Sequence, residues 1–233
     1  LFTYNGQPQG PSLAGIPENF DDAIAYTYTG TGETHYSSSQ PPTNAGSYRA
    51  TATLNSGGYR GAATIKYTIV KKPVYLELTA EDATYDGSPH GATVSAQDVA
   101  PEDYEVTYRG ANGTEYGPTS KAPTDAGSYT AEVKLVNPNM TGSQTTTYTI
   151  SPAAQVIEGK TDYTATYGNA GIVFENTAKT PVSYEIVPNE DGSPSPISIQ
   201  GSYASIVSAG KVRVVAHAAA SRNYAAAKDV ELT

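Results

Sequence analysis

The chain has 233 residues, a formal net charge of −9 and no cysteine. The acidic balance, without any basic cluster, disfavours nucleic-acid binding, and the lack of cysteine excludes disulfides, thiolate nucleophiles and Cys-ligated zinc. The sequence also lacks an apolar run of the roughly 20 residues that a membrane-spanning helix needs. Its composition favours β-structure with many turns, because 19 Tyr, 22 Gly and 16 Pro are spread along the chain.

Short stretches of alternating apolar and polar residues predict strands along the whole chain. The clearest of them, in chain order, are residues 48–54, 65–69, 104–108, 129–135, 182–186 and 212–218. Alternation of this kind indicates sheets with one buried face and one solvated face, as in antiparallel sandwiches. The expected fold class is therefore all-β.

An internal repeat of 81 residues organises the sequence. Four separated landmarks recur at that spacing: Tyr4-Asn5-Gly6 as Tyr85-Asp86-Gly87, Pro42–Tyr48 as Pro123–Tyr129, Gly61 as Gly142, and Tyr67-Thr68-Ile69 as Tyr148-Thr149-Ile150. A third and more diverged copy places Tyr167-Gly168 and Ala209-Gly210 in comparable positions. Self-similarity at a fixed period predicts tandem modules.

Two short joints, at residues 70–73 and 150–153, separate the modules, and each contains a proline. Proline cannot extend a strand ladder, and it stiffens a linker. We therefore expect three modules at residues 1–72, 73–152 and 153–233, which are called the first, second and third repeat below. The first repeat is expected to lack the strand that should precede Tyr4. Because the chain opens on Leu1, we interpret it as a piece of a longer protein.

The stretch Thr124–Ala131 resembles the start of strand F in immunoglobulin domains, where a tyrosine hydroxyl bonds back to nearby backbone. This resemblance implies a structural tyrosine corner at Tyr48 and Tyr129, with Ala50 and Ala131 in place of the usual cysteine. The whole pattern, closely over residues 1–152 and more loosely over 153–233, is similar to the MBG-type bacterial immunoglobulin-like repeats of surface and secreted adhesin-like proteins. That similarity implies tandem immunoglobulin-like antiparallel β-sandwiches with an extracellular, non-catalytic role.

Metal and catalytic signals are weak. The three histidines, His35, His90 and His217, fall in different repeats and show no metal-ligand spacing. No nucleophile elbow or phosphate loop is present, so we expect neither catalytic residues nor a cofactor. The strand lysines that can be phased, Lys134 and Lys211, are expected to point outward, which disfavours intramolecular isopeptide bonds.

Paired acidic residues occur in four expected turns, at Asp21-Asp22, Glu81-Asp82, Glu102-Asp103 and Glu190-Asp191. Calcium close to the joints would use Glu81, Asp82 and Asp162. Calcium needs about 6–8 oxygen ligands, however, and the sequence contains no calcium-loop motif. Solvated turn carboxylates are the favoured interpretation.

The leading functional hypothesis is a spacer segment of a bacterial surface or secreted protein, which presents other domains away from the envelope. The alternative is an adhesive module that recognises a host glycan or protein through exposed loops rich in Tyr and Asn. The first place to look for such a ligand is the loop around His35 and Tyr36, although an ordinary connecting loop is also expected there. We expect the isolated chain to be monomeric.

Overall fold

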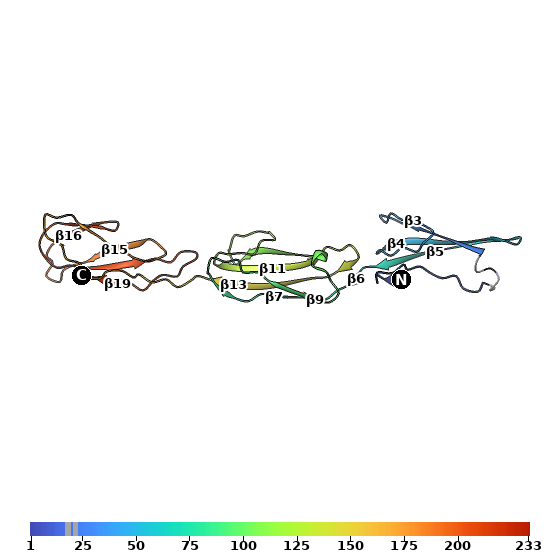
Figure 1. Ribbon diagram of the computed structural model, residues 1–233, viewed down its shortest axis with the longest axis horizontal. Coiled ribbons are helices and arrows are strands. Elements are labelled where there is room, and N and C mark those ends of the chain that lie inside the picture. The colour runs from blue at the N-terminus through green and yellow to red at the C-terminus, as the bar shows by residue number, and fades with distance from the viewer. Residues whose placement is uncertain (17–19, 21–22) are drawn as a thin grey trace. The chain divides into compact units, whose positions relative to one another are not determined.

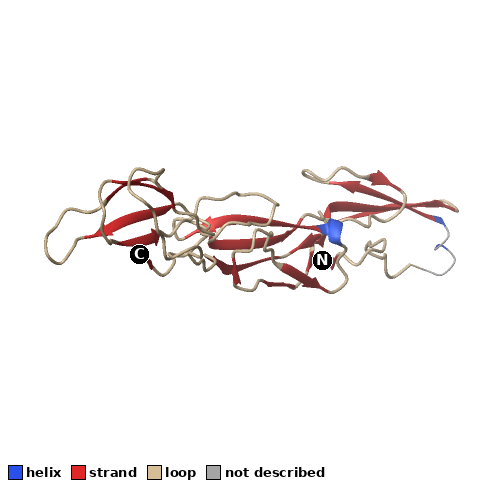
Figure 2. Ribbon diagram, turned by 60° about the vertical axis from the view of Figure 1, so that its left-hand side comes forward, coloured by secondary structure: helices blue, strands red, loops and turns tan. Residues whose placement is uncertain are grey.

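A computed structural model describes residues 1–16, 20 and 23–233 (Figure 1). Strands and the loops between them make up nearly all of this part of the chain, as Figure 2 shows, with a short 3-10 helix η2 at Pro101–Asp103. The strands are β1 (Phe2–Thr3), β2 (Ile24–Gly30), β3 (Ser37–Ser38), β4 (Gly46–Ser56), β5 (Tyr59–Val70), β6 (Lys72–Pro73), β7 (Leu76–Thr79), β8 (Ala83–Thr84), β9 (Thr93–Ala96), β10 (Tyr104–Ala111), β11 (Gly127–Leu135), β12 (Met140–Thr141), β13 (Ser143–Ser151), β14 (Ile172–Val173), β15 (Val182–Val187), β16 (Ile197–Gln200), β17 (Tyr203–Ile206), β18 (Arg213–Ala218) and β19 (Val230–Leu232). The predicted fold class, tandem immunoglobulin-like antiparallel β-sandwiches, is confirmed.

The chain forms two compact units. The first unit comprises Leu1–Thr79, Thr93–Thr107 and Glu132–Thr146, and the second comprises Ala80–Ala92, Tyr108–Ala131 and Thr147–Thr233. Each unit therefore contains one terminal repeat together with part of the second repeat. The division into three modules at residues 72 and 152 stays a prediction.

In the first unit, the first repeat forms a sheet with strand order β1-β5-β4-β2-β3. The long hairpin of β4 and β5 places Tyr48 opposite Tyr67. The short strand β1 precedes Tyr4 and pairs parallel with the end of β5, as β8 pairs parallel with the end of β13 in the second unit. β7 has no counterpart among the described residues of the first repeat.

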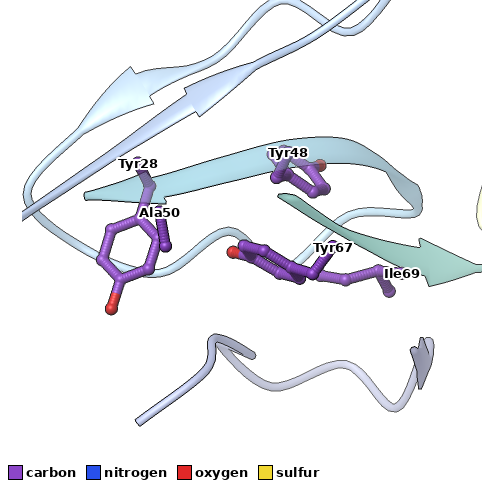
Figure 3. Packing of buried hydrophobic residues seen from close by; sticks show 5 residues of the cluster. All are labelled: Tyr28, Tyr48, Ala50, Tyr67 and Ile69. Atoms are coloured by element: carbon purple, nitrogen blue, oxygen red, sulfur yellow. The ribbon is translucent and has the colours of Figure 1, made fainter. Parts of the chain in front are cut away.

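The core of the first repeat is built mainly from phenol rings. Figure 3 shows its buried side chains, which project from one face of the sheet: Tyr28, Tyr48, Ala50, Tyr67 and Ile69. The rings of Tyr48 and Tyr67 lie side by side, with centroids 5.6 Å apart. The Tyr67 hydroxyl donates to the carbonyl of Gln9 over 3.1 Å, so the N-terminal segment covers this face of the sheet.

The second repeat contributes a four-stranded sheet with order β10-β11-β13-β8 and the antiparallel pair β7-β9. The alternation in β11 is complete, since Tyr129, Ala131, Val133 and Leu135 are buried while Lys134 is exposed. In β7, Leu76 and Leu78 are buried and Glu77 is exposed. The period-2 pattern of the sequence therefore marks the buried face of these strands.

The third repeat lies in the second unit and consists of two three-stranded sheets, β14-β17-β16 and β15-β18-β19. Its buried core contains a single phenylalanine and four aliphatic residues: Phe174, Ala204, Val214, Ala216 and Leu232. Strand β18 buries Val214, Ala216 and Ala218, as the alternation of residues 212–218 predicts. In the described residues, no helix is long and apolar enough to cross a membrane.

Candidate functional site: the asparagine junctions

Asn139 occupies a preorganised turn between β11 and β12. The Asn139 amide donates to Oδ1 of Asn137 over 2.9 Å, and the Met140 amide donates to the carbonyl of Asn137 over 3.2 Å. The side chain of Asn137 is anchored in turn, because its Nδ2 donates to Oδ1 of Asp103 over 2.8 Å. Local side-chain hydrogen bonds of this kind hold asparagine-rich turns in one conformation.

Inside the first unit, the side chain of Asn139 bridges to the loop that precedes β4. Its Oδ1 accepts the Ala45 amide over 2.8 Å, and its Nδ2 donates to Oδ1 of Asn44 over 3.0 Å. The backbone on the other side of the turn is also paired, since Lys72 donates its amide to the carbonyl of Asn139 over 2.9 Å. One residue therefore links the first repeat, the joint and the second repeat. We call this arrangement the first junction.

The loop that receives Asn139 is held by the tyrosine corner. The Tyr48 hydroxyl donates to the carbonyl of Asn44 over 2.8 Å. Gly46 permits this close packing, because a Cβ at that position would lie 2.8 Å from Cγ2 of Thr34 and 2.9 Å from the Tyr48 hydroxyl oxygen. The Ala-Gly-Ser-Tyr motif thus shapes a loop whose Ala45 amide is presented to an acceptor.

Inside the second unit, the same arrangement recurs with Asn223, and we call it the second junction. Asn223 Oδ1 accepts the Ala126 amide over 2.8 Å, and its Nδ2 donates to Oδ1 of Asp125 over 2.9 Å. The Ala153 amide donates to the carbonyl of Asn223 over 2.9 Å. The receiving loop has the same corner, in which the Tyr129 hydroxyl donates to the carbonyl of Asp125 over 2.6 Å. The three hydrogen bonds made by the side chain and carbonyl of Asn139 therefore each have a counterpart here.

The second junction carries an additional charged contact. Arg222 Nη1 lies 3.4 Å from Oδ2 of Asp125, and Arg222 Nε donates to the carbonyl of Ala126 over 3.2 Å. The side chains of Arg222 and Asp125 are about half exposed, so solvent and salt screen this ion pair strongly. In the first junction, the position before the bridging asparagine is Pro138, which has no charge.

The sequence repeat does not predict the two bridging asparagines, because they do not recur at the spacing of the repeated motifs. Asn139 and Asn223 lie 84 positions apart, whereas the Ala-Gly motifs of the second and third repeats, Ala126-Gly127 and Ala209-Gly210, lie 83 apart. In the first repeat, the position equivalent to Asn139, counted back from Gly61, is Gly58. Only the hydrogen bonds reveal that two asparagines at unequal spacing have the same role.

Two buried tyrosines, Tyr67 in the first repeat and Tyr148 in the second, have raised pKa values. Burial, and next the neighbouring phenols, raise the pKa of Tyr67 and Tyr148 well above the ordinary value of 10.0. Each hydroxyl donates to a backbone carbonyl, Tyr148 to that of His90 over 2.7 Å. Ionisation of these groups would therefore require that the cluster open.

This arrangement predicts a loss of stability at alkaline pH. A folded pKa above the unfolded one means that the folded state holds the proton more tightly, so the stabilisation is complete below about pH 10 and is lost progressively above it. We expect near-ultraviolet circular dichroism of the tyrosines to be lost as the pH rises beyond that point, together with the appearance of phenolate absorbance. Tyr148→Phe should reduce the slope of stability against pH in this range, and an unchanged slope would contradict the assignment.

Of the two residues proposed for a ligand-binding loop, Tyr36 is packed against the core and His35 is exposed. Tyr36 packs edge-on against Tyr48, with ring centroids 5.7 Å apart, and its hydroxyl donates to the carbonyl of Gln40 over 2.8 Å. Tyr116 repeats this arrangement against Tyr129 in the second repeat, with centroids 5.5 Å apart. The ring of Tyr36 is therefore engaged in intramolecular packing, whereas His35 is exposed. A ligand role for this loop stays a prediction.

The calcium candidates serve as hydrogen-bond acceptors for the backbone or for hydroxyl groups. Asp82 Oδ1 accepts the Thr149 amide over 2.7 Å, and Asp162 Oδ1 accepts the Thr233 hydroxyl over 2.8 Å. Glu81 is exposed. Within residues 1–16, 20 and 23–233, no group of three or more His, Cys, Asp or Glu side chains could hold a metal ion. The acid pair Asp21-Asp22 lies outside the described residues.

The remaining histidines form ion-pair contacts at the surface. His90 Nε2 lies 3.1 Å from Oδ1 of Asp86. His217 lies between two carboxylates, with Nδ1 at 2.8 Å from Asp229 and Nε2 at 3.7 Å from Glu185. All of these groups are partly or largely exposed, so these contacts fit surface pairing.

Comparison with known families identifies the repeat. A family model described as the MBG domain matches residues 2–73 and again residues 76–154. The chain belongs to the MBG domain family. The two MBG matches cover the first and second repeats, including both receiving loops with their Ala-Gly-Ser-Tyr motifs. No curated protein sequence matches the chain significantly.

Solved structures similar to this MBG chain are multi-domain segments with low sequence identity. They include Sidekick-1 immunoglobulin domains 1–5, at 13% identity over 89% of this chain and 52% of that chain, with a TM-score of 0.27. The three N-terminal domains of the bacteriophage RB49 Highly Immunogenic Outer Capsid protein match at 13% identity over 94% and 87%, with a TM-score of 0.27. Zebrafish RET cadherin-like domains 1 to 4 match at 10% identity over 90% and 64%, with a TM-score of 0.25. The chain thus spans about half the length of the Sidekick-1 segment.

Proposed function

We propose that this MBG chain is a non-catalytic spacer segment of a bacterial surface or secreted protein, and that it presents other domains away from the envelope. The observation that supports the proposal most strongly is the repetition of one asparagine bridge at two joints. A structural role depends on reproducible linkage between neighbouring modules, and each junction adds side-chain hydrogen bonds to the paired backbone of the joint.

Family membership supports the extracellular and non-catalytic parts of the proposal. MBG modules and the immunoglobulin-like fold are of a type common in extracellular proteins, and this fold is typically non-catalytic. The formal charge of −9 on 233 residues gives a solvated surface that disfavours non-specific association with anionic polymers. These properties suit a segment that connects other domains without interacting with them.

The spacer function is tested by a search for ligands. The chain, immobilised through one terminus, is exposed to an array of host glycans and extracellular-matrix proteins at high concentration. We expect no saturable binding. Saturable binding to one glycan or protein, lost on heat denaturation of the chain, would replace the spacer function by the adhesive one.

Adhesion through the loop around His35 and Tyr36 has little support, because the ring of Tyr36 is packed against Tyr48. The observation that favours a binding function is located elsewhere, in a cavity of the third repeat. It concerns a different ligand chemistry and is developed below.

A further inference from the structure

The third repeat contains a cavity of about 890 Å³ between its sheets. Its lining includes the apolar residues Ile172, Phe174, Val214 and Leu232 together with polar and charged side chains. Phe174 belongs to an aromatic row, with the ring of Tyr163 at 5.3 Å and that of Tyr184 at 4.7 Å between centroids. Ligand pockets in proteins have about 300–1,000 Å³, so this cavity is large enough for a small molecule.

The cavity lies where the third repeat lacks one of the phenol rings of the first two repeats. In the first repeat, the paired strands β4 and β5 place Tyr48 opposite Tyr67, and both rings are buried. Strands β18 and β19 of the third repeat place Val214 opposite Leu232 and Ala216 opposite Val230. Counted from the Ala-Gly motif, Val214 and Ala216 take the positions of Ala50 and Ala52, so they are no smaller than their counterparts in the first repeat. The motif position that holds Tyr48 and Tyr129 in the first two repeats is Val212, which lines the cavity.

The first two repeats show which chemistry fills such a space in this fold. Each packs a group of phenol rings between its strands and covering segments, around Tyr48 and Tyr67 in the first and Tyr129 and Tyr148 in the second. The hydroxyls of these rings bond to backbone carbonyls. The third repeat retains the sandwich and has lost these rings from its hairpin.

The charged residues that line the cavity favour a neutral ligand. Its charged lining groups balance, since Asp162 and Glu190 stand against Lys211 and Arg213. Arg213 is already paired with Glu231 at 3.6 Å, and Asp162 accepts the Thr233 hydroxyl over 2.8 Å. Asn189 also lines the cavity, and its Nδ2 already donates to the Ser193 hydroxyl oxygen over 3.0 Å. A neutral ring with one hydroxyl group matches a lining that combines apolar, polar and balanced charged side chains.

We propose that the cavity of the third repeat binds a neutral phenol ring. Burial of the ring against Phe174 and the aliphatic lining residues supplies the driving force, and polar groups of the lining accept or donate the hydroxyl hydrogen bond. Apolar protein cavities are known to take up small aromatic rings in general. The ring has two possible sources, a small phenolic molecule or a tyrosine side chain of another protein.

The test is a titration of the isotopically labelled chain with p-cresol and, separately, with N-acetyltyrosinamide, followed by amide chemical shifts. We expect saturable shifts of Ile172, Phe174 and Val214 with p-cresol, and none at the amides of Tyr48 or Tyr129. Equal saturation with N-acetyltyrosinamide would identify a tyrosine side chain as a ligand source, whereas saturation with p-cresol alone would identify a small molecule. No saturable shift with either probe overturns the proposal.

Cavity-filling variants provide the control. Val212→Tyr gives the third repeat the motif of the other two and should weaken p-cresol binding about tenfold or more. Val207→Tyr makes the same change at an exposed position outside the lining and should leave binding unchanged. If Val212→Tyr does not fold, Ile206→Phe fills the cavity from strand β17. Undiminished binding in a folded cavity-filling variant contradicts the assignment.

Discussion

Replacement of Gln155 by leucine is expected to destabilise the third repeat by about 3 kcal/mol or more. Gln155 is only 9% exposed. Among the described residues, it is the polar or charged residue that is buried in the fold. Its Nε2 donates to the carbonyl of Ala225 over 2.8 Å and to Oγ1 of Thr180 over 2.9 Å. Its Oε1 accepts the amides of Lys179 and Thr180 over 3.0 and 3.1 Å.

The size of this effect follows from the groups that lose their partners. Leucine has a similar volume, so the packing changes little, but the partly buried backbone amides of Lys179 and Thr180 and the carbonyl of Ala225 would lose their hydrogen-bond partner. Each unsatisfied buried group costs roughly 1–3 kcal/mol. The segments that Gln155 connects are far apart in sequence, which makes the loss cooperative within the third repeat.

The measurement is urea unfolding followed through resolved amide signals of each repeat, because a chain of several domains does not unfold in one transition. Gln200→Leu, an exposed glutamine in the same repeat, is the matched control and should change stability by less than about 0.5 kcal/mol. Equal effects of the two substitutions would show that Gln155 does not hold the segments together.

Replacement of Tyr129 by alanine is expected to destabilise the second repeat by about 3–5 kcal/mol. Tyr129 is 0% exposed. Its ring contacts Tyr116 and Tyr148, with centroids 5.5 and 5.8 Å away, and its hydroxyl holds the carbonyl of Asp125. Removal of the ring leaves a cavity and releases the loop that receives Asn223.

Tyr129→Phe separates the contribution of ring packing from that of the hydroxyl hydrogen bond, since it keeps the ring and removes the hydroxyl. It should cost about 1–3 kcal/mol, because the Asp125 carbonyl loses its donor. Tyr75→Ala is the control, since Tyr75 lies in the same repeat and is 79% exposed. Denaturant unfolding of the second repeat gives all three values, and a Tyr129→Ala cost as small as that of Tyr75→Ala would contradict a central role for the corner.

The strand pattern and the corner motif could be derived from sequence because both are local. Alternation over residues 129–135 defines a buried face that depends only on the period of a strand. The Ala-Gly-Ser-Tyr motif is similarly compact, and the structure shows its hydrogen bond within four residues, from Tyr129 to Asp125. The family resemblance drawn from these motifs agrees with the MBG matches at residues 2–73 and 76–154.

The junctions and the cavity could not be derived in this way because both depend on distant residues. Asn139 acts on Ala45, which lies 94 positions earlier, and no local pattern relates the two. The cavity depends on the register of β18 with β19, and a register is fixed by strand pairing in three dimensions. Tyr36 illustrates the same limit, since the surrounding Gly, Ser and Thr indicate a loop but not that its ring packs against Tyr48.

Hydrogen exchange at two alanine amides tests the junctions most directly. Ala45 and Ala126 each donate an amide to an asparagine side chain over 2.8 Å. We predict that both amides are protected in the unmodified chain, that Asn139→Ala abolishes protection of Ala45 alone, and that Asn223→Ala abolishes protection of Ala126 alone. Free exchange of both amides in the unmodified chain, or retention of protection in the two variants, would contradict the asparagine bridge as the repeated link between modules.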